Sequence, residues 1–444
     1  GASGGNSVWV QVPPSAQKNV NIIFKRFLDY NTIKNAYLKG GIMKKIILAL
    51  LFFTTIFAQT SAIALFEESR QALSNGNLDI AREKILAAID ADKGNDQLRK
   101  EFDRLNGLNN KANNANRAIE DGRFDDAISG FNSVLESIPK YVPGFYGLAK
   151  AYEGKKDFDA AIQNYKSALS LDSSHANSKK SIQNIAKKLY NAANKDYKSG
   201  NLEAAMKKYN QVLGINSRIY QAHFQLGVLY KKMGNISQAI QSYQSALNIK
   251  KTYDKGWYAL GIAHKENGDI DNAKKAFEET VRLNQKYYKA HKSLGEIFID
   301  LQQYDNAVKS FKTAISYKSN YAAAYHALGI TYGKGKLEDY RRSVEALEEA
   351  VKLNKREVLS WYSLAESYNE LGECDKAKEA ALEAVDLKKN FGGGWFQLGI
   401  AEYCNATGNK NGAINHFERA RNDRQWRKMA EYEIDRVKNP EKFE

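Results

Sequence analysis

Residues 223–246 read HFQLGVLYKKMGNISQAIQSYQSA, residues 257–280 read WYALGIAHKENGDIDNAKKAFEET, and residues 291–314 read HKSLGEIFIDLQQYDNAVKSFKTA. The stretches start 34 residues apart and share a Leu-Gly pair, then a small residue, a ring and another small residue. Self-similarity at this period is typical of a stacked helix-turn-helix unit. Apolar residues recur at helical spacing, so each unit is predicted to hold two amphipathic helices.

The shared positions indicate how the two helices pack. Small residues let helix backbones approach closely, and rings fill the space beside them. One unit alone has no partner for its apolar face, so neighbouring units must share a continuous core. The repeated positions are Leu226, Leu260, Leu294 and Leu328, each followed by Gly; the rings His223, Trp257, His291 and Tyr325; Ala239, Ala273 and Ala307; and Tyr243, Phe277 and Phe311.

This pattern resembles the tetratricopeptide repeat (TPR) family, in which ring-x-x-Leu-Gly-x-x-Tyr is followed by Gly and then by Ala-x-x-x-ring-x-x-Ala. The resemblance covers residues 62–424. It implies an all-α fold, a right-handed superhelical solenoid of about ten helix-turn-helix units with the first helices on the concave face. The first repeat is degenerate, and residues 96–107 and 176–185 are insertions between repeats. Repeats begin near residues 62, 108, 142, 186, 220, 254, 288, 322, 358 and 392.

The start of the solenoid is preceded by an export signal. Met43-Lys44-Lys45 leads into an apolar run over 46–57 and then small residues, which is typical of a secretory signal peptide over 43–62. Cleavage after Ala58 and cleavage after Ala62 both fit. An uncleaved membrane anchor stays open, because no charge occurs over 46–66. Residues 1–42 show no sustained periodicity, and we interpret them as non-native upstream read-through before a start at Met43.

The remaining boundaries follow from the repeat. Residues 63–107 hold the degenerate first repeat and its insertion, and residues 108–424 hold the main solenoid. Residues 425–444 are predicted to form a C-terminal capping helix and tail, because a stacked array needs a polar outer cap. The side of this helix that should face the array carries Trp426, Met429, Ala430, Ile434 and Val437.

The resemblance implies that a ligand lies along the concave groove, touched by the second, fifth, ninth and twelfth residues of each first helix. At matching positions, rings recur with aliphatic residues one turn on and lysines at the edges. Such a groove favours an extended peptide or amphipathic helix with acidic flanks. Alternatively, the rings only pack against neighbouring helices. The candidate partner-binding residues are Tyr190, Asn194, Phe224, Val228, Lys231, Tyr258, Ile262, Lys265 and Lys292.

Enzyme chemistry is not predicted. The sequence lacks metalloprotease, nucleophile-elbow and phosphate-loop motifs. We therefore expect no catalytic residue, metal or cofactor. Cys374 and Cys404 lie in adjacent repeats; a disulfide is open, but we expect two partly buried thiols because sequence alone does not bring them together.

The charge balance bears on partners. The net charge is +15, and residues 1–58 contribute seven Lys or Arg and one Asp, so 59 basic and 50 acidic residues remain, or +9. We expect a non-enzymatic protein-interaction scaffold of the bacterial cell envelope, in the periplasm, secreted, or anchored to the inner membrane. The alternative is a subunit or regulator of an envelope enzyme or secretion machine. An RNA-binding helical repeat is least favoured because of the signal peptide, and no nucleic-acid partner is expected.

Overall fold

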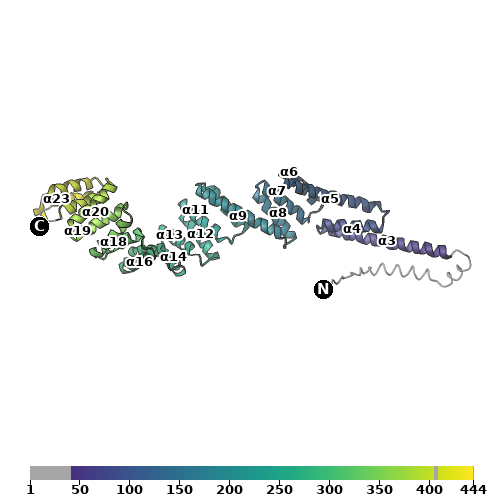
Figure 1. Ribbon diagram of the computed structural model, residues 1–444, viewed down its shortest axis with the longest axis horizontal. Helices are drawn as coiled ribbons and strands as arrows, with labels where there is room; N and C mark the ends of the chain where they lie inside the picture. The colour runs from purple at the N-terminus through teal and green to yellow at the C-terminus, as the bar shows by residue number, and fades with distance from the viewer. Residues whose placement is uncertain (1–41, 405–408, 444) are drawn as a thin grey trace. The chain divides into compact units, whose positions relative to one another are not determined.

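The computed structural model describes residues 42–404 and 409–443, and all the regular structure in these ranges is helical (Figure 1). The proposed read-through segment lies outside the described residues except for Ile42. The chain forms two compact units, residues 1–185 and 186–444. The boundary between them falls within helix α9 (Ala176–Lys198).

The described residues form 21 α-helices and one short 3-10 helix. The bounds are α3 (Ile42–Ser74), α4 (Leu78–Ala91), α5 (Asp96–Glu120), α6 (Phe124–Ser137), α7 (Val142–Gly154), α8 (Phe158–Leu171), α9 (Ala176–Lys198), α10 (Leu202–Ile215), α11 (Tyr220–Lys232), α12 (Ile236–Ile249), α13 (Asp254–Glu266), α14 (Ile270–Leu283), α15 (Tyr288–Asp300), α16 (Tyr304–Tyr317), α17 (Ala322–Tyr332), α18 (Tyr340–Leu353), α19 (Val358–Glu370), α20 (Cys374–Leu387), α21 (Gly392–Glu402), α22 (Lys410–Ala420), α23 (Arg427–Lys438) and η1 (Pro440–Lys442).

Successive helices pair, from α3 with α4 to α21 with α22, and α23 follows the last pair. Within each unit the second helix of a pair also contacts the first helix of the next, so the cores of neighbouring pairs are continuous. This confirms the predicted all-α solenoid of about ten helix-turn-helix units with a C-terminal capping helix.

The Leu-Gly pair is explained by the close approach of the two helices. A Cβ built on Gly261 of α13 would lie 2.6 Å from a ring carbon of Phe277, which is fully buried on α14. Only a glycine leaves room for that ring. The same approach recurs between Gly227 and Tyr243, between Gly295 and Phe311, and between Gly399 and Phe417.

The ring three residues before each Leu has a second role at the junctions between repeats. The indole N–H of Trp257 donates to the carbonyl of Lys251, six residues earlier, at 2.8 Å. A carbonyl only accepts, so the histidines at this position carry their proton on Nε2. His223 and His291, which the repeat pattern assigns to this ring position, therefore close turns. The other ring-to-carbonyl pairs are His223 to Ser217, His291 to Gln285, Trp361 to Lys355 and Trp395 to Lys389.

The two insertions do not separate the repeats. Residues 96–107 are the first turns of α5, and residues 176–185 are the first turns of α9, which run on without a break. α5 has 25 residues and α9 has 23, against 13 for α11. The inserted residues thus lengthen two first helices.

Helix α3 joins the predicted export signal to the first repeat. Ala62, Ser69 and Ala72 are buried in the first repeat, and the Ser69 hydroxyl donates to the carbonyl of Ala81 on α4 at 2.7 Å. In contrast, Leu48 and Phe52 are exposed. Among the described helices, Lys45–Ser74 is long and apolar enough to cross a membrane, a test that a signal sequence also passes.

The C-terminal helix packs on the last pair through part of its predicted apolar side. Ala430, Ile434 and Val437 of α23 are buried together with Phe417. Met429 was expected on that side but is 51% exposed, because α23 presents a narrower face to the array than its apolar residues span.

Candidate partner-binding groove

The nine candidate residues lie on the successive first helices α9, α11, α13 and α15, all within residues 186–444. Each is half-buried. Lys265 on α13 and Lys292 on α15 pair with the same carboxylate, Glu296, which brings these two candidate residues together. We call these nine residues the groove set.

Two of the three rings of the groove set pack in two directions, and the third, Tyr190, contacts Tyr209 with ring centroids 5.8 Å apart. The ring centroid of Tyr258 lies 5.7 Å from that of Phe277 on its own second helix and 5.0 Å from that of Tyr287 before the next repeat. Burial raises the pKa of Tyr258. Phe224 likewise contacts Tyr243 at 5.5 Å and Tyr253 at 5.2 Å. Each ring therefore contributes to the core and still exposes part of its surface.

The second ring contacts of Phe224 and Tyr258, with Tyr253 and Tyr287, were not predicted from the sequence. Tyr253, Tyr287 and Tyr321 each precede a first helix and are spaced by 34 residues, a signal that the repeat itself contained. Burial raises the pKa of Tyr287 and of Tyr321 to about 12, so both hydroxyls stay protonated at neutral pH. Tyr253 and Tyr287 extend the aromatic row from Phe224 and Tyr258 towards the next repeat, and Tyr321 contacts Tyr288.

The lysines of the groove set are already balanced by carboxylates. Lys265 lies 3.0 Å from Glu296 of the next repeat, and Lys292 pairs with the same carboxylate. Lys231 lies 2.8 Å from Glu266. Burial raises the pKa of Glu296, but the two lysines outweigh it, and the pKa lies below its usual range. The charges of these three lysines are therefore already balanced within the chain.

The remaining groove residues are one amide and two aliphatic side chains. The Asn194 side-chain oxygen accepts a hydrogen bond from the Tyr209 hydroxyl at 2.7 Å, so its own repeat holds it. Val228 and Ile262 pack at the edges of two core clusters and stay half-buried. These two residues offer apolar surface that no polar contact occupies.

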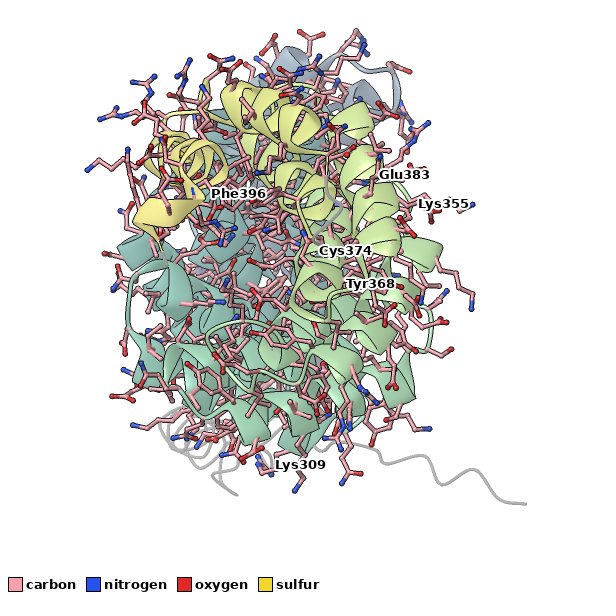
Figure 2. All side chains as sticks on the ribbon, turned by 90° about the vertical axis from the view of Figure 1, so that its left-hand side faces the viewer. Lys309, Lys355, Tyr368, Cys374, Glu383 and Phe396 are labelled. Carbon is pink, nitrogen blue, oxygen red and sulfur yellow. A yellow bond between two sulfur atoms is a disulfide. The ribbon has the colours of Figure 1, made fainter. Side chains whose placement is uncertain are left out.

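Further along the same unit, aromatic packing continues to the end of the array. Tyr362 and Phe396, at the fifth positions of α19 and α21, both contact Trp426, with ring centroids 5.8 Å and 5.0 Å away. Trp426 precedes α23, so the capping segment places its own ring on this row. Figure 2 shows Phe396 inside this end of the chain and Glu383 on its outer surface.

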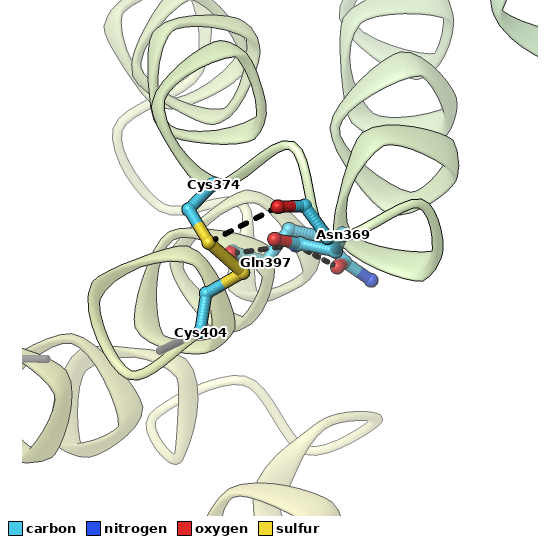
Figure 3. The surroundings of a disulfide bond; sticks show 5 residues. Asn369, Cys374, Gln397 and Cys404 are labelled. Carbon is cyan, nitrogen blue, oxygen red and sulfur yellow. Dashed lines mark hydrogen bonds between the residues drawn. A yellow bond between two sulfur atoms is a disulfide. The ribbon is translucent and has the colours of Figure 1, made fainter. Parts of the chain in front are cut away.

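A disulfide joins Cys374 and Cys404, whose Cα atoms are 5.7 Å apart (Figure 3). The expectation of two thiols is wrong, because stacking brings the start of α20 beside the end of α21. Next to this bridge, the Asn369 amide donates to the backbone and side-chain oxygens of Gln397. A pocket of about 670 Å³ adjoins it, lined by Asn369, Glu370, Tyr403, Cys404, Arg436 and Phe443.

The polar contacts of His264 and His326 are with side chains of the repeats themselves. His264 is 8% exposed, and its Nδ1 lies 3.1 Å from an Asp269 carboxylate oxygen. Burial lowers the pKa of His326, whose Nδ1 lies 3.0 Å from the Ser360 hydroxyl. Within the described residues, no group of three or more His, Cys, Asp or Glu side chains is placed to hold a metal ion.

Family profiles match much of the chain. Profiles described as TPR repeat match residues 193–234, 230–268 and 295–335. Profiles described as tetratricopeptide repeat match residues 334–390, 142–175 and 254–287. A comparison with the curated proteins gives no match.

Solved structures of several repeat proteins resemble parts of the chain. A tetratricopeptide repeat protein from Parabacteroides merdae is 16% identical and covers 58% of this chain and 100% of its own, with a TM-score of 0.43. PilF from Pseudomonas aeruginosa is 15% identical, with 47% and 94% covered and a TM-score of 0.42. MamA from Desulfovibrio magneticus is 20% identical, with 38% and 95% covered and a TM-score of 0.36.

These similarities are too distant to transfer a partner. The family profiles together cover about half of the chain, and the repeat pattern and the paired helices agree with these profiles. This chain belongs to the tetratricopeptide repeat family.

Proposed function

We propose that this chain is an exported scaffold of the bacterial cell envelope that binds a peptide or helical segment of another protein along the groove set. Proteins of this family are generally non-enzymatic interaction scaffolds. The observation that carries the proposal is the row of half-buried aromatic and aliphatic side chains on successive first helices. Such a row offers an extended apolar track, which suits a segment with apolar anchors at regular spacing.

Two features on different parts of the chain support export. The apolar part of α3 leaves large side chains such as Leu48 and Phe52 exposed, which suits a signal sequence or a membrane anchor. The disulfide between Cys374 and Cys404 belongs to an oxidising compartment, because the cytosol keeps most thiols reduced. We infer a periplasmic location for the mature chain.

The charges favour a protein partner over a nucleic acid. Lys231, Lys265 and Lys292 of the groove set already pair with carboxylates. Nucleic-acid binding depends on lysines and arginines that neutralise phosphates. The second-position lysines Lys255 and Lys289 are exposed at the start of their helices and suit an acidic flank of a peptide.

The test is a cross-linked pull-down from the envelope fraction. We compare the chain with a Val228→Gln/Ile262→Gln variant, which makes the apolar track polar without removing a packed ring. The matched control is Ile249→Gln/Leu353→Gln, because both residues are exposed at the ends of second helices. Circular dichroism and urea unfolding check that all three proteins fold.

A partner that is recovered by the original chain and by the control, and lost with the groove variant, supports the proposal. Equal recovery by all three folded proteins contradicts it, since binding then lies elsewhere on the solenoid. The identity of the partner also distinguishes a scaffold from a subunit of an envelope enzyme or secretion machine.

A further inference from the structure

One carboxylate on a first helix in the C-terminal part of the array has no ion pair with a cation among the described residues. Glu366 is the ninth residue of α19 and is half-buried. The Tyr362 hydroxyl donates to it at 3.3 Å. Among the described residues, no Lys, Arg or His nitrogen forms an ion pair with Glu366, although many exposed carboxylates of this chain do have one.

The chain itself shows what this position accommodates. Glu296 is the ninth residue of α15, the matching place two repeats earlier, and two lysines share its carboxylate. One of them, Lys292, is the fifth residue of the same helix. The other, Lys265, is the twelfth residue of the preceding first helix. A half-buried carboxylate at the ninth position is thus neutralised by lysines from two defined places.

Around Glu366, the two positions that match Lys292 and Lys265 hold other residues. Its own helix has Tyr362 where α15 has Lys292, and the preceding repeat has Gly333 where α13 has Lys265. The nearest lysines are engaged elsewhere. Lys334 lies 2.7 Å from Glu370, and Lys336 donates to the carbonyl of Ile330 at 3.0 Å.

Space for a ligand lies one helical turn further along α19. Asn369 and Glu370 line the pocket of about 670 Å³ described above, which also reaches Arg436 and Phe443. A chain segment seated in this pocket has a carboxylate one turn away. The lining mixes polar and charged side chains, such as Asn369 and Arg436, with the rings of Tyr403 and Phe443, so it suits a segment that offers both polar and apolar groups.

We propose that Glu366 receives a lysine or arginine side chain of the bound partner, which takes the place that Lys292 and Lys265 occupy around Glu296. This inference rests on the proposed function and names the chemistry of the partner at the C-terminal part of the concave side. Burial raises the pKa of Glu366, because the Tyr362 hydroxyl and the nearby Lys334 and Lys336 offset only part of the cost of its charged form. An incoming ammonium or guanidinium group removes that cost.

The test selects binders from a phage-displayed library of random peptides, using the purified full chain as bait. Parallel selections use Glu366→Gln and the matched control Glu383→Gln, which makes the same change on the exposed surface of α20. Gln has the shape of Glu and needs no counter-charge, so the variant is expected to fold. The affinity of a selected basic peptide is then measured for all three proteins.

Enrichment of Lys or Arg at one position of the selected peptides is expected for the original chain and for the control, and not for Glu366→Gln. The selected peptide should bind that variant about tenfold more weakly, as for loss of a partly buried charge pair. Selected peptides without a basic preference, or one that survives Glu366→Gln, overturn this inference and leave the proposed function intact. Failure to select any peptide contradicts both.

Discussion

The glycine after each Leu is the residue on which a repeat depends most directly. A methyl group at Gly261 would lie 2.6 Å from the Phe277 ring, which is fully buried and has no room to move away. Gly261→Ala should therefore destabilise the chain by about 1–3 kcal/mol, the usual range for overpacking. The urea midpoint measures this effect.

The matched control for that change is Gly214→Ala. Gly214 lies in the last turn of α10, and a Cβ there meets nothing within 4 Å. Alanine favours a helix over glycine by about 1 kcal/mol, so this variant should be more stable than the original chain. Equal midpoints for the two variants would show that the close approach of helix and ring is not what limits the repeat.

A second residue-scale prediction concerns the turn within a repeat. Most such turns have glycine at positive φ, such as Gly268 at 80°, but Gln302 adopts φ 59°. A side chain in this left-handed region costs about 1 kcal/mol. Gln302→Gly should raise the urea midpoint. Gln241→Gly, in the middle of α12 and exposed, should lower it. A fall in both would contradict the explanation.

The unpaired Glu366 predicts a pH dependence. Its pKa is raised in the folded chain, so the folded state holds the proton more strongly than the unfolded state. Both states are protonated at low pH, and stability is lost as pH rises through the folded pKa. Glu366→Gln should match the original chain in acid and be more stable at neutral pH. Parallel urea curves across this range test it; a constant difference would indicate another cause.

At the scale of helices, the disulfide ties the start of α20 to the end of α21. The bridged residues are 30 positions apart, and closing a loop of this size contributes about 2–4 kcal/mol. Cys374→Ser/Cys404→Ser should therefore unfold at a lower urea concentration than the oxidised chain. A reductant should shift the original chain towards the variant and leave the variant unchanged. A reductant-insensitive original chain would show that the bridge does not form.

The paired helices could be predicted from the sequence, but the contacts between repeats could not. Spacing and the Leu-Gly pairs were enough for the paired helices, because that pattern lies within one unit. The sequence did not predict the additional first turns of α5 and α9, because a polar insertion can form either a loop or further turns of a helix. Lys265 and Glu296 are 31 residues apart, so their pairing depends on the register between neighbouring repeats. The Cys374–Cys404 bridge depends on the same register.

At the scale of the whole molecule, the N-terminal helix decides where the solenoid resides. If residues 43–58 remain attached, the exposed Leu48, Leu51 and Phe52 should hold the chain in a bilayer. A chain that begins at Gln59 keeps the Ser69 contact with α4 and should stay in the aqueous fraction. Membrane flotation of both forms tests this, and N-terminal sequencing of protein from the envelope shows which form exists.

A Leu48→Lys/Phe52→Lys variant is the control for membrane flotation. Two charges in the apolar run should release the long form from lipid, because a lysine near the centre of a spanning helix costs about 3 kcal/mol. Binding that persists in this variant would point to the solenoid surface instead.

The hydrogen bond from the ring to the carbonyl six residues earlier, which closes five of the junctions, has an evolutionary consequence. Trp257 and Lys251 are six residues apart, so the bond between them lies within any duplicated segment that includes both. A copied or deleted repeat thus carries its own junction. The pairing of Lys265 with Glu296 spans two repeats and is remade only if the new neighbour supplies a carboxylate. Recombination can therefore change the length of such an array easily, while its pattern of charges has to be selected anew.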